Sequence, residues 1–338
     1  MVKAKTKKAS VKKPKRDPYL QGITKKTAAK KAASKRPRLA KKVSKPEPVA
    51  MSPGSLAERA MLVKLTISCW GAKRNDHNVA QEVADKHQSD ATMGRFTKVL
   101  LKSENREKFL KVAREAKVVH RRMTLPWDEG VGLLPASMYF KFTEAMSEKR
   151  RKAEEHIEAF VKEYAEQWNG GMSRYKAQLG SLFDENDYPE PDRVRSKYGI
   201  RVRTFPISDP NDFRVQMSEE AKDALKAQMF QDYRSELEDA LKIPFVRLHR
   251  VLSKVQEKLS EEDAIFRDSL IDNVREMVEL LPALNITGNK DLEALLNRTN
   301  KEVAGIVDMK ALRKDPKFRK QVAASAASIL KGMKGYVS

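Results

Sequence analysis

The stretch ASMYFKFTEAMSEKRRKAEEHIEAFVKEYAEQWNGG, residues 136–171, decides the fold of this chain. Its apolar or bulky side chains recur at steps of three and four residues, with one gap at Arg150, and this spacing places them on one face of a helix. They are Tyr139, Phe142, Met146, Ala153, Ile157, Phe160, Tyr164 and Trp168. Pro135 suits the first turn of such a helix, and Gly170–Gly171 suits its end. We therefore predict one helix over 136–168, roughly 50 Å long at about 1.5 Å per residue.

Apolar stripes with helical spacing continue on both sides of this stretch. They predict helices over 77–87, 92–102, 104–122, 172–183, 218–281, 289–305 and 316–333. Within 218–281, Pro244 is expected to kink or break the helix, and Ser260 is expected to cap a second arm. The segments 71–76 and 124–135 are polar or bounded by prolines, and they predict loops.

A small amount of β-structure is predicted beside the helices. Residues 61–70 alternate apolar and polar side chains, which is typical of a strand. A hairpin is predicted near 199–217, where 199–207 and 213–217 flank the turn sequence SDPND. The predicted fold is therefore mainly α: a bundle of long helices, or coiled-coil-like arms, with a small antiparallel β element.

The positive charge of the chain is concentrated at the N-terminus. Residues 1–50 contain 18 Lys or Arg against Asp17 and Glu47, which gives +16 of the net +22 and leaves +6 for the rest. Almost nothing in this Lys-, Ala- and Pro-rich segment can be buried, and such composition is typical of disorder. We divide the chain into a disordered basic tail (1–57), a helical body with the hairpin (58–290), and C-terminal helices that pack on the body or extend it (291–338).

Two groups of basic residues are candidates for binding nucleic acid. A flexible basic tail binds phosphate groups by neutralising their charge and releasing counterions. On the predicted hairpin, Arg201 and Arg203 alternate with Ile200 and Val202, so both arginines share one face. The candidate residues are Lys7, Lys8, Lys12, Lys13, Lys15, Arg16, Lys25, Lys26, Lys30, Lys31, Lys35, Arg36, Arg38, Lys41, Lys42, Arg201 and Arg203. A solubilising tail and a solvated sheet face are the alternative interpretations.

No motif in the sequence indicates catalysis or a metal site. Cys69 is the only cysteine, which excludes an internal disulfide and a multi-cysteine zinc site. There is no HExxH, GxxxxGK[ST] or GxSxG. The acidic stretch 184–192 lacks the glycine of a calcium loop and predicts a turn-rich surface loop. No apolar run approaches the roughly 18–20 residues needed to span a bilayer. We expect no cofactor, no metal, no membrane association and a cytoplasmic location.

Four motifs carry a resemblance to a known family. They are LPWDEGVGLLP (125–135), LFDENDYPEPDRV (182–194), FPISDPNDFRV (205–215) and LLPALN (280–285). Together they resemble an uncharacterised family, a domain of unknown function in bacteriophages, plasmids and integrative elements, over residues 60–290 and without the tail. The resemblance implies a phage or mobile-element setting. As partners it implies a MoxR/CobS-like AAA+ ATPase and a CobT-like von Willebrand factor A protein, and it implies no catalytic residues.

The predicted function is a non-enzymatic adaptor associated with nucleic acid, whose tail binds the phosphate backbone of DNA without sequence specificity and whose body binds proteins. One alternative is a phage structural or assembly protein that contacts packaged DNA or an acidic partner. A second alternative is a metal-dependent nuclease with carboxylates from distant parts of the chain. The helices are also expected to allow a homo-oligomer.

Overall fold

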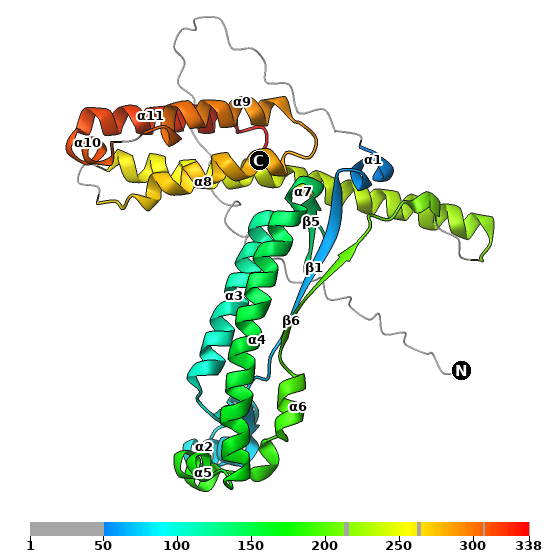
Figure 1. Ribbon diagram of the computed structural model, residues 1–338, viewed down its shortest axis with the longest axis vertical. Helices are drawn as coiled ribbons and strands as arrows, with labels where there is room; N and C mark the ends of the chain where they lie inside the picture. Colours follow the sequence, from blue (N-terminus) through cyan, green and yellow to red (C-terminus); the bar gives the residue numbers. More distant parts are fainter. Residues whose placement is uncertain (1–50, 213–215, 262–264, 307, 338) are drawn as a thin grey trace, which may run out of the picture. The chain divides into compact units, whose positions relative to one another are not determined.

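The computed structural model describes residues 51–212, 216–261, 265–306 and 308–337. The chain divides into two units, Met1–Val43 and Ser44–Ser338, and all described residues belong to the second. This unit is mainly α-helical with a small antiparallel sheet, which confirms the predicted fold class (Figure 1). The predicted tail lies outside the described residues up to position 50, whereas its positions 53–57 form a helix.

The described helices and strands follow one another along the chain. The α-helices are α1 (Pro53–Ala57), α2 (His77–His87), α3 (Glu104–Met123), α4 (Tyr139–Asn169), α5 (Ser173–Leu179), α6 (Pro191–Ser196), α7 (Glu219–Ser260), α8 (Ser269–Leu284), α9 (Lys290–Thr299), α10 (Met309–Lys314) and α11 (Pro316–Gly332). The strands are β1 (Ala60–Ser68), β2 (Lys73–Asp76), β3 (Phe96–Val99), β4 (Leu125–Pro126), β5 (Val131–Pro135) and β6 (Gly199–Phe205). Short 3-10 turns are η1 (Ala91–Met93), η2 (Ala136–Met138), η3 (Gly180–Leu182), η4 (Glu185–Asp187) and η5 (Pro210–Asp212), and η6 (Asn300–Ala304) is a π-helical turn.

Helix α4 is the predicted long helix, and it packs along α3 (Figure 1). The buried members of its stripe are Phe142, Met146, Ala153, Ile157, Phe160 and Tyr164. The predicted helix is therefore confirmed, and its apolar face is the one that enters the core. The contact between the two helices also includes an ion pair, in which Lys149 Nζ lies 2.8 Å from Glu115 Oε2 on α3.

Strand β1 lies between β5 and β6 in a four-stranded antiparallel sheet with the order β4-β5-β1-β6. It confirms the strand predicted over 61–70. β6 confirms the first arm of the predicted hairpin, but its hydrogen-bonded neighbour along its whole length is β1. The second arm, 213–217, lies partly outside the described residues, and its described residues 216–217 belong to no strand. Alternation along a strand predicts its two faces but does not specify its neighbour, and here the neighbour is distant in sequence.

A second, two-stranded sheet of β2 and β3 forms where no strand is predicted. β2 lies in the predicted loop 71–76, and β3 lies in the segment 92–102, for which the predicted helix is wrong. Gly94 interrupts that helical stripe, and the residues after it pair with β2 in an antiparallel ladder. The predicted loop 124–135 contains β4 and β5, which join the larger sheet.

Helix α7 is continuous over Glu219–Ser260 although it contains Pro244, so the predicted break does not occur. Pro244 is buried beside Phe245, whose ring stacks on Tyr336 with centroids 4.1 Å apart. This packing offsets the loss of one hydrogen bond inside the helix. Ser260 is the last residue of α7 and does not cap α8, which begins at Ser269.

The side chain of Arg247 joins α7 to the C-terminus of α3. Its guanidinium donates to the carbonyl oxygens of Arg122, Arg121 and Thr124 at 2.9, 2.7 and 2.7 Å. Carbonyls at a helix end have no partner inside the helix, and a cation there also complements the helix dipole. Burial, together with Arg250, lowers the pKa of Arg247 to about 10, so the side chain stays charged at neutral pH. Because α11 packs on α7, the C-terminal helices share one core with the body.

We expect Phe160→Asp to lower the free energy of unfolding by about 3 kcal/mol or more, because Phe160 is 1% exposed and the new carboxylate would be buried without a partner. Urea denaturation followed by circular dichroism measures this change. Ala159→Asp is the matched control, since Ala159 is the exposed neighbour on the same helix and should cost less than about 1 kcal/mol. Equal stability of the two variants would contradict the assignment of the buried face.

Candidate nucleic-acid interface

Basic side chains gather on one face of the four-stranded sheet. In the register of β1 against β6, Lys64 lies directly opposite Arg203, and Thr66 lies directly opposite Arg201. Directly opposed residues in an antiparallel pair project to the same face, and all four of these residues are exposed. The structure thus places the two predicted arginines on one face and adds Lys64 from β1. The alternation along residues 61–70 predicted that Lys64 would project away from the apolar face. It did not predict that Lys64 would lie next to the two arginines.

The other face of the sheet is covered by helices. α3 packs on β1 and α4 packs on β6, and Val63 on that side is 0% exposed. His120 of α3 is buried there, with Nε2 3.2 Å from the carbonyl oxygen of Val63, and burial lowers the pKa of its imidazole. α7 packs on β4, where Leu125 is 0% exposed. The helices therefore cover one face and the β4 end, and they leave Lys64 and its neighbours exposed.

The positive charge on this face is not neutralised within the sheet. The four strands contain no Asp or Glu. Among the described residues, no ion pair involves Lys64, Arg201 or Arg203. Like charges directly opposite each other in a sheet cost roughly 0.2–1 kcal/mol, and solvent screening reduces this cost at an exposed site. A bound anion would relieve the repulsion between Lys64 and Arg203.

Phe205 adds an aromatic ring to the same surface. It lies two residues from Arg203, so both project to the same face, and the residue is 39% exposed. Cations that track a backbone beside an aromatic ring on which bases stack are typical of proteins that bind single-stranded nucleic acid. We call Lys64, Thr66, Arg201, Arg203 and Phe205 the basic sheet face. The predicted tail residues, from Lys7 to Lys42, lie outside the described residues.

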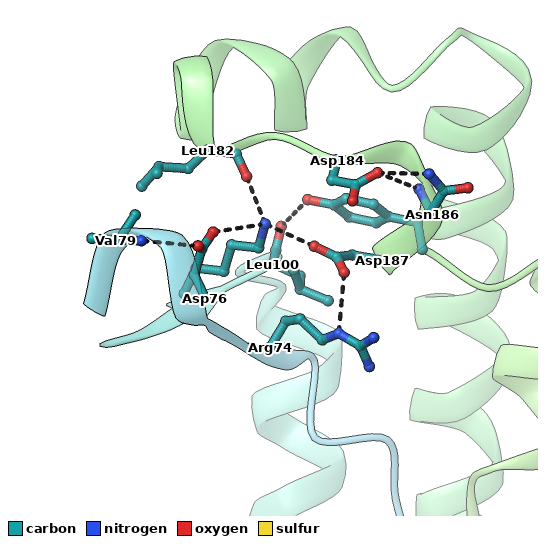
Figure 2. Close-up of polar contacts among 10 residues, drawn as sticks. Arg74, Asp76, Val79, Leu100, Leu182, Asp184, Asn186 and Asp187 are labelled. Carbon is teal, nitrogen blue, oxygen red and sulfur yellow. Dashed lines mark hydrogen bonds and ion pairs between the residues drawn. The ribbon is translucent and has the colours of Figure 1, made fainter. Parts of the chain in front are cut away.

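A second charged cluster joins the β2–β3 pair to η4. Lys98 Nζ lies 2.8 Å from Asp187 Oδ2, 3.4 Å from Asp76 Oδ2 and 2.8 Å from the carbonyl oxygen of Leu182. Arg74 Nε lies 3.3 Å from Asp187 Oδ1. Figure 2 shows Asp76 and Asp187 directed toward one point from two separate segments. The side chains of Lys98 and Asp187 are each only 7% exposed, so the cluster is a buried ion network.

The acidic stretch 184–192 is a turn-rich surface segment as predicted, and the network corrects this expectation at one position. The exposed acidic residues of the stretch are Asp184, Glu185, Glu190 and Asp192. The prediction of a surface loop is wrong for Asp187, which is buried against Lys98. The adjacent Tyr188 is also buried, and its hydroxyl donates to the carbonyl oxygen of Leu100 at 2.7 Å. This cluster was not predicted, because Lys98 lies in a segment that was expected to be helical.

The pKa shifts in the cluster indicate that its charged form is stable at neutral pH. Burial alone would lower the pKa of Lys98, but the hydrogen bonds and charges of Asp187 and Asp76 outweigh it, and the pKa is raised. The hydrogen bond from the Val79 N–H holds the pKa of Asp76 below its usual value, and Lys98 adds to this effect against the opposing influence of burial. Ionised Asp76 stabilises the folded state at pH values above the pKa that it has in the unfolded chain. This stabilisation is lost as the pH falls through its lower pKa in the folded protein. Protonated Lys98 stabilises the folded state at pH values below the pKa that it has in the unfolded chain. This stabilisation is lost as the pH rises through its higher pKa in the folded protein.

In the described ranges, no three His, Cys, Asp or Glu side chains are grouped so that they could hold a metal ion. In those same ranges, no helix combines the length and the apolar character that a membrane span requires.

Comparison with known proteins gives no relative of this chain. No family model matches the sequence, and neither the curated proteins nor the solved structures yield a match. The resemblance over residues 60–290 therefore stays a prediction.

We expect Lys98→Ala to lower the free energy of unfolding by about 3 kcal/mol, because it leaves the Asp187 carboxylate buried without its main cation. Urea denaturation at neutral pH measures the change. Lys102→Ala, at an exposed position four residues away, is the control and should change stability by less than about 0.5 kcal/mol. If both variants unfold at the same urea concentration, the cluster does not stabilise the β2–β3 pair.

Proposed function

We propose that this protein is a non-enzymatic adaptor that binds nucleic acid through the phosphate backbone, without sequence preference. The observation that supports this best is the basic sheet face, where Lys64 and Arg203 are directly opposed and the sheet supplies no acidic residue. The basic tail supports the same function, since residues 1–50 carry +16 of the net +22.

The geometry of the basic sheet face suits a polyanionic strand. Residues two apart on one strand are separated by roughly 6.6 Å, and directly opposed residues by about 5 Å. Arg201 and Arg203 therefore present two guanidinium groups along β6, on the scale of successive phosphates, while Lys64 extends the charge onto β1. Arginine forms paired hydrogen bonds with phosphate oxygens, and Phe205 offers a ring on which a base can stack.

The tail and the sheet face contribute to binding in different ways. Tail contacts would be electrostatic and would depend on the number of charges, whereas the sheet face holds its cations on a rigid ladder. Contacts from the tail increase the local concentration of nucleic acid near the sheet face through linkage. These two contributions are consistent with a protein that binds nucleic acid without sequence specificity.

The adaptor role also requires a surface for protein partners. None of the first 14 residues of α7, 219–232, is buried, although Leu225, Met229 and Phe230 carry an apolar stripe there. We propose this segment as the place where the AAA+ ATPase or the von Willebrand factor A protein implied by the resemblance would bind. The proposed setting is the cytoplasm of a bacterial cell that carries a phage or a mobile element.

Replacing Lys64, Arg201 and Arg203 together by Gln should weaken binding of a short single-stranded oligonucleotide and make the slope of log K against log salt less negative by about 2, at roughly 0.7 per lost phosphate contact. Fluorescence anisotropy over a range of salt concentrations measures both quantities.

The matched control for this triple variant removes the same charge from another region. Lys310, Lys314 and Lys317 are exposed residues of the C-terminal helices, and their replacement by Gln should leave the salt slope nearly unchanged. If the two triple variants lose affinity equally, net charge alone explains the binding, and the sheet face is not the site.

Deletion of residues 1–50 tests the contribution of the tail. If six to eight of its cations meet phosphates on duplex DNA, the slope of log K against log salt is roughly −5 to −7, and the deletion should remove most of it. The melting temperature of the rest of the chain should stay nearly the same. A truncated protein that binds duplex DNA as tightly, with the same slope, would contradict a role for the tail.

A further inference from the structure

A hollow of about 410 Å³ lies in the surface beside the buried ion network. It is lined by Lys73, Arg74, Asn75, His77 and Thr97. These residues come from β2, from its partner β3 and from the first position of α2. Every lining side chain carries a hydrogen-bond donor or can carry one, and none is acidic. A hollow with this lining favours an anion over a cation.

The hydrogen bonds of the lining residues direct donors toward a ligand. Thr97 Oγ1 donates to Asn75 Oδ1 at 2.9 Å, so the amide oxygen of Asn75 is already engaged and its NH₂ group is the part left for a ligand. Arg74 lies opposite Lys98 in the ladder and its Nε lies 3.3 Å from Asp187 Oδ1, so its guanidinium is on the other face of the β2–β3 pair from Lys73, Asn75 and Thr97.

The buried ion network prevents nearby carboxylates from competing for these donors. Asp76 accepts the Val79 N–H and pairs with Lys98, while Asp187 pairs with both Lys98 and Arg74. Asp76 and Asp187 are therefore engaged by the network. The same network connects the β2–β3 pair to η4, and this holds the strands that carry the lining residues in place.

From this arrangement we infer that the hollow binds a phosphate-type oxyanion. The Lys73 ammonium, the Asn75 amide NH₂ and the His77 imidazole come from β2 and the start of α2, and together they can donate to several oxygens of one tetrahedral anion, whereas a carboxylate offers only two. The phosphate could belong to a small free compound or to a nucleic-acid chain, since both present the same oxygens. The inference does not rest on the proposed function, because the hollow shares no residue with the basic sheet face.

The test is a titration of the full chain with inorganic phosphate, followed by the NMR signals of the Asn75 side-chain amide and the Thr97 backbone amide. We expect both signals to shift and to saturate. In Lys73→Gln/His77→Gln the apparent affinity should fall roughly tenfold, since charge-assisted hydrogen bonds are lost. Neither residue belongs to the buried ion network, and an unchanged melting temperature would confirm that the variant is folded.

Lys86→Gln/Lys102→Gln is the matched control, because it removes two exposed cations from the same region without changing the lining of the hollow. It should titrate like the wild type. The inference is overturned if the signals do not saturate, or if the lining variant and the control bind phosphate equally.

A second arm of the experiment identifies the source of the phosphate and separates this inference from the proposed function. Saturation of the same two signals by a short oligonucleotide that lacks terminal phosphates supports binding of a backbone phosphate. Saturation by inorganic phosphate alone supports a small phosphate compound. Replacement of Lys64, Arg201 and Arg203 by Gln should leave the inorganic phosphate titration unchanged, so failure of the sheet-face proposal would be visible separately.

Discussion

The register of β1 against β6 is the constraint on which both the core and the basic sheet face depend. Val63 and Lys64 are neighbours on β1, and they project to opposite faces of the sheet. Val63 enters the core beneath α3, while Lys64 meets Arg203 on the outer face. A slip of one residue would bury the lysine and expose the valine, which is costly on both counts. The energy that fixes the register is hydrophobic, and the placement of the charges follows from it.

The described residues contain two groups of cations with opposite energetic character. Around Lys98, each charge has a partner within hydrogen-bonding distance, as a buried ion requires. On the basic sheet face the cations lie opposite each other, and the strands contain no acidic residue. Because these side chains are exposed, water screens part of the repulsion between them. The ion pairs around Lys98 connect the β2–β3 pair to η4, so they have a structural role. The basic sheet face has no acidic partner within the sheet, and this is why we propose an external anion for it.

The fold was predictable from the sequence wherever a periodic apolar stripe sets the structure locally. The stripe on α4 and the alternation in β1 each correctly predicted an element and its buried face. Strand pairing was not predictable, because alternation in β6 matches any strand of the same period, and β1 lies far away in sequence. For the candidate site, this meant that Arg201 and Arg203 could be placed on one face, but Lys64 could not be joined to them. The Lys98 network was missed for a related reason, since its members come from three segments and none carries a local motif.

Edge protection is the strongest alternative explanation for the arginines of β6. β6 is an edge strand of the sheet, and charged side chains on an edge discourage pairing with another chain. That explanation accounts for Arg201 and Arg203, whose strand has one unpaired side. It does not account for Lys64, because β1 is hydrogen-bonded on both sides and has no edge to protect. Placing a third cation opposite Arg203 increases the repulsion without improving the protection. An anion that contacts both strands would give all three cations a common role, and this is the argument for the nucleic-acid backbone that we propose as the ligand.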